Sequence, residues 1–133
     1  MSDHEPLDAY DLAASLTVRE LEHSAAWYQG ALGFTLDRKH ERNGRLIAIS
    51  LKAGTAALLL TQDDGAKGID RPKGEGFSLQ LSTTQDADAL AARAKHYGAE
   101  LDTEPTTMPW GPRIFRLRDP DGFRWTISSG KRG

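Results

Sequence analysis

The chain repeats its own pattern of elements when it is aligned with itself at an offset of 65 residues. Gly33 then falls on Gly98, and Thr61 falls on Thr126. The identical residues are few and of common types, but the order of the secondary-structure patterns repeats as well. We therefore expect the chain to fold as two copies of one unit.

Both halves begin with a strand pattern and continue with a helix pattern. Residues 11–18 and 77–82 alternate between apolar and small polar side chains, which is typical of half-buried strands. Residues 21–31 place apolar side chains at helical spacing, and residues 86–97 are alanine-rich with acidic residues at the start. A glycine follows each helix pattern, as is common where a helix ends.

Three further strands are predicted after each helix, and turn residues separate them. The predicted strands are 34–40, 45–52 and 55–61 in the first half, and 99–103, 113–118 and 123–128 in the second. Asn43-Gly44 predicts a two-residue hairpin, and Asp119-Pro120-Asp121-Gly122 predicts a tight turn. These patterns predict a single α+β domain over residues 1–133. It consists of two tandem βαβββ units at about 8–61 and 76–130, joined by a polar, Gly- and Pro-rich linker at 62–75.

Composition excludes several classes of function. The 17 basic and 19 acidic residues include no basic patch for nucleic acid, and no apolar run approaches the roughly 20 residues of a membrane span. The chain has no cysteine, so disulfides, thiolate metal sites and cysteine nucleophiles are excluded. Its N-terminus is acidic and polar, unlike a signal peptide. We expect a cytoplasmic protein that binds neither nucleic acid nor membranes.

The repeated βαβββ pattern and its motifs resemble the vicinal oxygen chelate superfamily. Its members include glyoxalase I, extradiol dioxygenases and drug-binding proteins of the bleomycin-resistance type. The residues that carry the resemblance are 18–22 and 26–34 in the first unit, and 88–95, 98–100, 110–113 and 119–125 in the second. The resemblance implies a glyoxalase-like fold, in which each sheet curls into a half-barrel, the helices pack outside and the concave face holds the site.

The resemblance also implies where a metal would be held. Catalytic members of the family bind one metal through His or Gln, Glu, His and Glu, at positions that correspond here to Ala13, Thr61, Ser78 and Thr126. None of these side chains supplies the carboxylate or imidazole that a divalent cation needs. Shifting the register by two residues does not assemble even two such ligands, and the histidines lie at His4, His23, His40 and His96. We therefore predict no metal and no other cofactor.

A concave face of small neutral side chains leaves room for an organic ligand. We predict that the chain binds a planar or drug-like small molecule without chemistry, as the antibiotic-sequestering members of the family do. The predicted ligand-binding residues are Ser15, Thr61, Ser78, Gln80, Trp110, Arg113, Phe115 and Thr126. The resemblance also implies a homodimer, with units from two chains completing each cavity.

Other interpretations of these residues stay open. The chain could be an enzyme with a displaced metal, or one that uses acid–base chemistry without a cofactor through Asp37, His40 or Glu41. It could also be an interaction protein whose cavity has lost its function. Arg113 could form a salt bridge to the 62–75 linker or to Glu104 instead of binding a ligand. The buried aromatic positions of a packed core are expected at Trp27, Tyr28 and Trp125.

Overall fold

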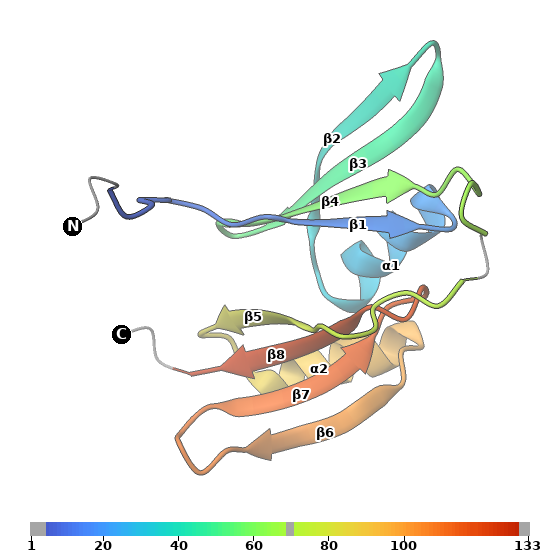
Figure 1. The fold of residues 1–133 in the computed structure, drawn as a ribbon. Helices are drawn as coiled ribbons and strands as arrows, with labels where there is room; N and C mark the ends of the chain where they lie inside the picture. Colours follow the sequence, from blue (N-terminus) through green and yellow to red (C-terminus); the bar gives the residue numbers. More distant parts are fainter. Residues whose placement is uncertain (1–4, 69–70, 131–133) are drawn as a thin grey trace.

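The computed structural model of the chain describes residues 5–68 and 71–130, and it contains two units of the same topology (Figure 1). The first unit consists of β1 (Ala14–Val18), α1 (Leu21–Ala31), β2 (Thr35–Arg42), β3 (Arg45–Ala53) and β4 (Ala56–Gln62). The second consists of β5 (Leu79–Thr83), α2 (Ala87–Tyr97), β6 (Leu101–Thr107), β7 (Arg113–Arg118) and β8 (Arg124–Ser129). The predicted α+β architecture of tandem βαβββ units is confirmed.

Each unit forms one four-stranded sheet, in the orders β1-β4-β3-β2 and β5-β8-β7-β6. The β1–β4 and β5–β8 pairs are parallel, and the other neighbours are antiparallel. The Asn43-Gly44 hairpin forms as predicted, with φ of 52° and 75° at its two residues. Within the described ranges, no helix is long and apolar enough to span a membrane.

Two predicted details of the strands are wrong. The strand predicted at 99–103 runs instead from 101 to 107 and includes Pro105, which is tolerated because β6 lies at the edge of its sheet. The offset of 65 residues also fails in the last strand of each unit. Gln80 pairs with Thr126, whereas the corresponding Ser15 pairs with Leu59, so Leu59 is the counterpart of Thr126. The turn before β8 spans residues 119–123, whereas the turn before β4 spans only 54–55, and this difference shifts the offset.

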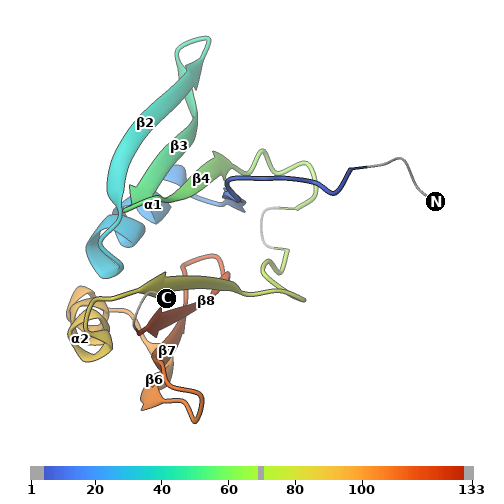
Figure 2. The ribbon, with the colours of Figure 1, turned by 90° about the vertical axis from the view of Figure 1, so that its left-hand side faces the viewer.

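The two helices pack against each other where the units meet (Figure 2). Asp86 caps the N-terminus of α2, and Gly98 ends this helix at φ 111°. The last carbonyl groups of a helix lack partners within the helix. In α1, Arg93 of the other unit fills this role, because its guanidinium donates hydrogen bonds to the carbonyl oxygens of Gln29 and Gly30. The second unit therefore completes the C-terminus of the helix in the first.

A shared apolar core lies between the helices and the sheets. The ring of Tyr28 is fully buried and packs edge to face on Phe34 and Trp125, at centroid distances of 5.6 and 5.7 Å. Trp27 is also buried and packs against Tyr28. The expected core positions of Trp27, Tyr28 and Trp125 are confirmed.

Candidate ligand-binding site

Each sheet has one face toward the shared core and the helices, and one face that points away from them. The second is called the outer face. On the first sheet, Ser15, Thr17 and Thr61 lie on this face, opposite in parity to the buried Leu16 and Val18. The hydroxyl groups of Thr17 and Thr61 are 3.2 Å apart and share a hydrogen bond. The predicted residues Ser15 and Thr61 therefore share one polar surface.

The same face of the first sheet carries a histidine–serine pair that the sequence did not reveal. The Nε2 atom of His40 lies 2.8 Å from the Oγ atom of Ser50, within hydrogen-bond distance. The pair forms because a β-bulge moves His40 opposite Ala48. Counting back from the Asn43-Gly44 turn without the bulge would place His40 opposite Ile47, so the sequence pattern contained no signal for this contact.

On the second sheet, Gln80, Thr126 and Ser128 lie on the outer face. Thr126 and Ser128 are buried, whereas Gln80 is exposed. The Nε atom of Arg116 donates to the Oγ1 atom of Thr126 at 3.3 Å. Arg116 was not predicted as a site residue, and counting across the predicted Asp119–Gly122 turn would have placed it opposite Trp125. It lies opposite Thr126 because five residues, 119–123, separate the paired Arg118 and Arg124.

Four predicted residues do not join either outer face, and Arg113 is one of them because it has the same strand parity as Phe115. Phe115 is fully buried on the core side of its sheet, because its parity is that of Ile127 and not of Thr126. Trp110 is 76% exposed in the turn between β6 and β7. Ser78 is exposed just before β5 begins.

Arg113 is held by a carboxylate that was not anticipated. Its guanidinium donates to both carboxylate oxygens of Asp88 in α2, at 2.8 and 3.1 Å, and to the hydroxyl of Thr107. Neither Glu104 nor the linker is its partner, and Glu104 pairs with Lys95. The Asp88 carboxylate raises the pKa of Arg113, and the guanidinium lowers that of Asp88. The charges of the two groups are thus paired with each other, and this salt bridge joins β7 to α2.

The metal-ligand positions implied by the family do not fit a metal in this chain. With the corrected register, the four positions are Ala13, Leu59, Ser78 and Thr126. Aliphatic and hydroxyl side chains do not provide the anionic or imidazole donors of a divalent-metal site. Across residues 5–68 and 71–130, no group of three or more His, Cys, Asp or Glu side chains could hold an ion. His4 lies outside the described residues.

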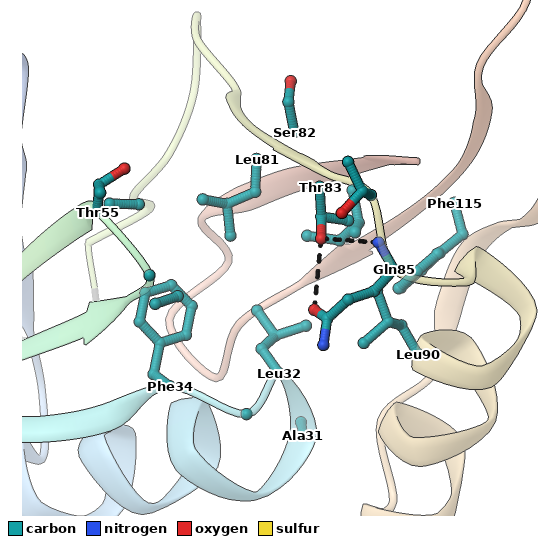
Figure 3. A pocket seen from close by; sticks show the side chains of 16 residues that line it. Ala31, Leu32, Phe34, Thr55, Leu81, Ser82, Thr83, Gln85, Leu90 and Phe115 are labelled. Carbon is teal, nitrogen blue, oxygen red and sulfur yellow. Dashed lines mark hydrogen bonds between the residues drawn. The ribbon is translucent and has the colours of Figure 1, made fainter. Parts of the chain in front are cut away.

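A pocket of about 360 Å³ lies on the core side, where the two units meet (Figure 3). Its apolar wall is formed by Leu32, Phe34, Leu81, Leu90 and Phe115. Figure 3 shows Leu32 and Phe34 on one side of the space and Leu90 and Phe115 on the other. Thr83 and Gln85, joined by two hydrogen bonds, provide a polar rim. Of the predicted site residues, this pocket contains Phe115.

The Asp119–Gly122 turn joins the second unit to α1. Tyr28 donates to Oδ2 of Asp119 at 2.6 Å, and the Trp125 indole N–H donates to the Tyr28 oxygen at 2.9 Å. Burial raises the pKa of both Tyr28 and Asp119, although the hydrogen bond from Tyr28 acts in the opposite direction on Asp119. Asp121 accepts hydrogen bonds from Ser24 Oγ in α1 and Lys73 Nζ in the linker. This buried network is structural, because each of its polar groups is paired within the protein.

The linker carries the acidic pair Asp63-Asp64, which alone suggests a cation loop. Asp63 instead accepts from Arg71 at 2.9 Å, Lys73 at 2.8 Å and the backbone N–H of Gly65. The hydrogen bond from Lys73 is the main reason that the pKa of Asp63 falls to about 2. Its carboxylate thus anchors the linker.

Comparison with known proteins agrees with this fold. A solved glyoxylase/bleomycin resistance protein/dioxygenase domain from Frankia sp. EAN1pec is 24% identical, with 96% of both chains covered and a TM-score of 0.73. TioX from Micromonospora sp. ML1 is 18% identical, with 90% of this chain and 98% of TioX covered and a TM-score of 0.72. A glyoxalase I mutant from Zea mays is 22% identical, with 90% of this chain and 44% of that chain covered and a TM-score of 0.75.

No curated protein sequence shows a significant match to the chain. At the identities of the solved structures, the similarity establishes the fold alone. The family profile described as Glyoxalase/Bleomycin resistance protein/Dioxygenase superfamily, however, matches residues 11–127. The chain belongs to this superfamily.

Proposed function

We propose that the chain is a metal-independent member of the superfamily that binds a small organic ligand without transforming it. The observation that carries the proposal is the set of residues at the family's metal-ligand positions, which are Ala13, Leu59, Ser78 and Thr126. None of them can bind a divalent cation through an anionic or imidazole group. The chemistry of the metal-dependent members therefore has no basis in these side chains.

The proposed site lies on the outer faces of the two sheets. Both faces carry small hydroxyl groups, such as Thr17 and Thr61 on the first sheet and Thr126 and Ser128 on the second. Such groups offer hydrogen-bond donors and acceptors and leave space for a bulky ligand. A role in antibiotic resistance by sequestration is the function that we propose for such binding.

We further propose that two copies of the chain form a dimer in which each copy covers the other's outer faces. Large apolar side chains support this proposal, because Leu7, Tyr10 and Leu12 are 91%, 102% and 92% exposed in the segment before β1. Three such side chains in six residues form a surface that is costly to leave in water. A gel-filtration mass near that of one subunit would contradict the dimer.

Binding is tested by screening a library of neutral, cationic and anionic aromatic compounds against the purified protein by thermal shift. A ligand at one hundred times its dissociation constant stabilises the folded state by about 2.7 kcal/mol, which a thermal shift detects readily. Substituting Thr126→Val should weaken the hits, whereas the exposed Thr107→Val should not. A library without a confirmed ligand would contradict the proposed function.

A second candidate function rests on the contact between His40 and Ser50. Its 2.8 Å distance places a base within reach of a nucleophile, as acid–base or acyl-transfer chemistry requires. This pair favours the alternative of a cofactor-free enzyme, for which activity on p-nitrophenyl esters is a direct test. Turnover that is lost in both His40→Ala and Ser50→Ala would support it, and equal rates in the parent and both variants would exclude it.

A further inference from the structure

Three arginines share the outer face of the second sheet. Strands β7 and β8 lie side by side as a hairpin (Figure 1). Arg118 and Arg124 are direct cross-strand partners next to its turn, and Arg116, two residues before Arg118 in β7, lies opposite Thr126. Residues two apart in a strand point to the same side, so the three guanidinium groups project from one face. The hydrogen bond from Arg116 to Thr126 confirms that face for Arg116.

The positive charge of this face is only partly neutralised. Asp102 in β6 binds Arg118 at 3.0 Å. Within the described part of the chain, no carboxylate lies within 4.0 Å of the guanidinium groups of Arg116 and Arg124, in contrast to Arg113 and its partner Asp88. Arginine stays protonated at all physiological pH values, so the excess charge is permanent.

The arrangement contradicts the usual pairing in sheets. Like charges placed directly opposite each other on two strands destabilise a sheet, as Arg118 and Arg124 do here. Asp102 offsets this repulsion at Arg118 only, and a departure from a local rule of this kind is expected at functional sites. An anion placed between the arginines would remove the repulsion.

We propose that this arginine face binds the carboxylate of an organic ligand. The proposal rests on the proposed binding function and names the ligand's chemical class. A guanidinium group offers parallel N–H donors that match the two oxygens of a carboxylate. The hydrogen bond to Thr126 engages Nε of Arg116, which leaves the terminal N–H groups to meet the ligand. Gln80 and Ser128 supply neutral polar groups beside it on the same face.

The test follows the arginine Nε–Hε resonances of the full-length ¹⁵N-labelled protein by NMR. Benzoate and benzamide serve as probes, because they have the same shape and differ in charge. Benzoate should shift the Arg116 and Arg124 resonances saturably, whereas benzamide should not. Arg113 is the internal control, since Asp88 already occupies its donors. The substitution Arg116→Gln should weaken benzoate binding about tenfold, as expected for a lost charge-assisted hydrogen bond, and Arg113→Gln should not.

Three results would overturn the proposal: no saturable shift with benzoate, equal shifts with benzamide, or parallel movement of Arg113. Failure of this inference is distinguishable from failure of the binding function. Confirmed library hits together with no saturable benzoate shift would leave the binding function intact and contradict the anion site. If benzoate shifts the resonances saturably but no compound in the library binds, the anion site stands and the proposed binding of a drug-like ligand is contradicted.

Discussion

A single hydroxyl group on Tyr28 connects helix α1 to the second sheet through two buried hydrogen bonds. It donates to Asp119 and accepts from Trp125, so its removal leaves the indole N–H without a partner. We expect Tyr28→Phe to lower the free energy of unfolding by about 1–3 kcal/mol, the cost of a buried unsatisfied group. Urea denaturation measures this change. The exposed Tyr10→Phe is the matched control, and equal stability of the two variants would show that the network contributes little.

Asp63 makes the stability of the linker depend on pH. Its pKa falls from an ordinary value of 3.8 to about 2 in the folded protein, mainly through Lys73. The folded state therefore holds this proton less tightly than the unfolded state, so the stabilisation is present above about pH 4. It is lost as the pH falls from 4 toward 2. Stability measured by denaturation across this range should fall less in Asp63→Asn than in the parent, and Asp64→Asn should behave as the parent does.

The helix contact between the units depends on the absence of a side chain at Gly30. A Cβ atom there would lie 2.0 Å from the ring of Tyr97 in α2. Replacing a helix glycine with alanine normally stabilises a protein by about 1 kcal/mol. We expect Gly30→Ala to gain less than this in the parent, because the half-exposed Tyr97 ring must move away, and to gain the full amount in a Tyr97→Ala background. Equal stabilisation in both backgrounds would contradict the close helix contact.

Elements that depend on local patterns could be predicted from the sequence. Helix α1 has the bounds 21–31 that apolar spacing indicated, and β7 begins and ends at residues 113 and 118 as expected. Other bounds moved by a few residues, and β6 extended through Pro105 because it is an edge strand. A residue pattern does not reveal which strand lies at an edge.

The candidate site was less predictable, because side-chain partners far apart in the chain decide it. Arg113 was expected to bind a ligand or pair with Glu104, but Asp88, 25 residues away, provides its partner. Phe115 was assigned to the ligand face, but strand parity places it in the core. Bulges and turn lengths set such registers, and a β-bulge also created the His40–Ser50 contact.

At the scale of the whole molecule, the account makes a claim about assembly. The two units share one core, whereas the two outer faces are surfaces that we propose a second copy covers. Deleting the exposed segment 5–12 should weaken dimerisation, because it removes Leu7, Tyr10 and Leu12. Analytical ultracentrifugation across a concentration series measures the change. An unaltered dimer would exclude this segment from the interface.

The central claim is that this member of the superfamily works without a metal, and calorimetric titration tests it most directly. Zn²⁺, Ni²⁺, Mn²⁺ and Fe²⁺ are each titrated into tag-free, chelator-stripped protein. Because Ala13, Leu59, Ser78 and Thr126 cannot form the family's metal site, we predict no stoichiometric binding of any of the four ions. Binding of one ion per chain with a dissociation constant below about 10 μM, or roughly −7 kcal/mol, would contradict the account and favour a metal-dependent enzyme.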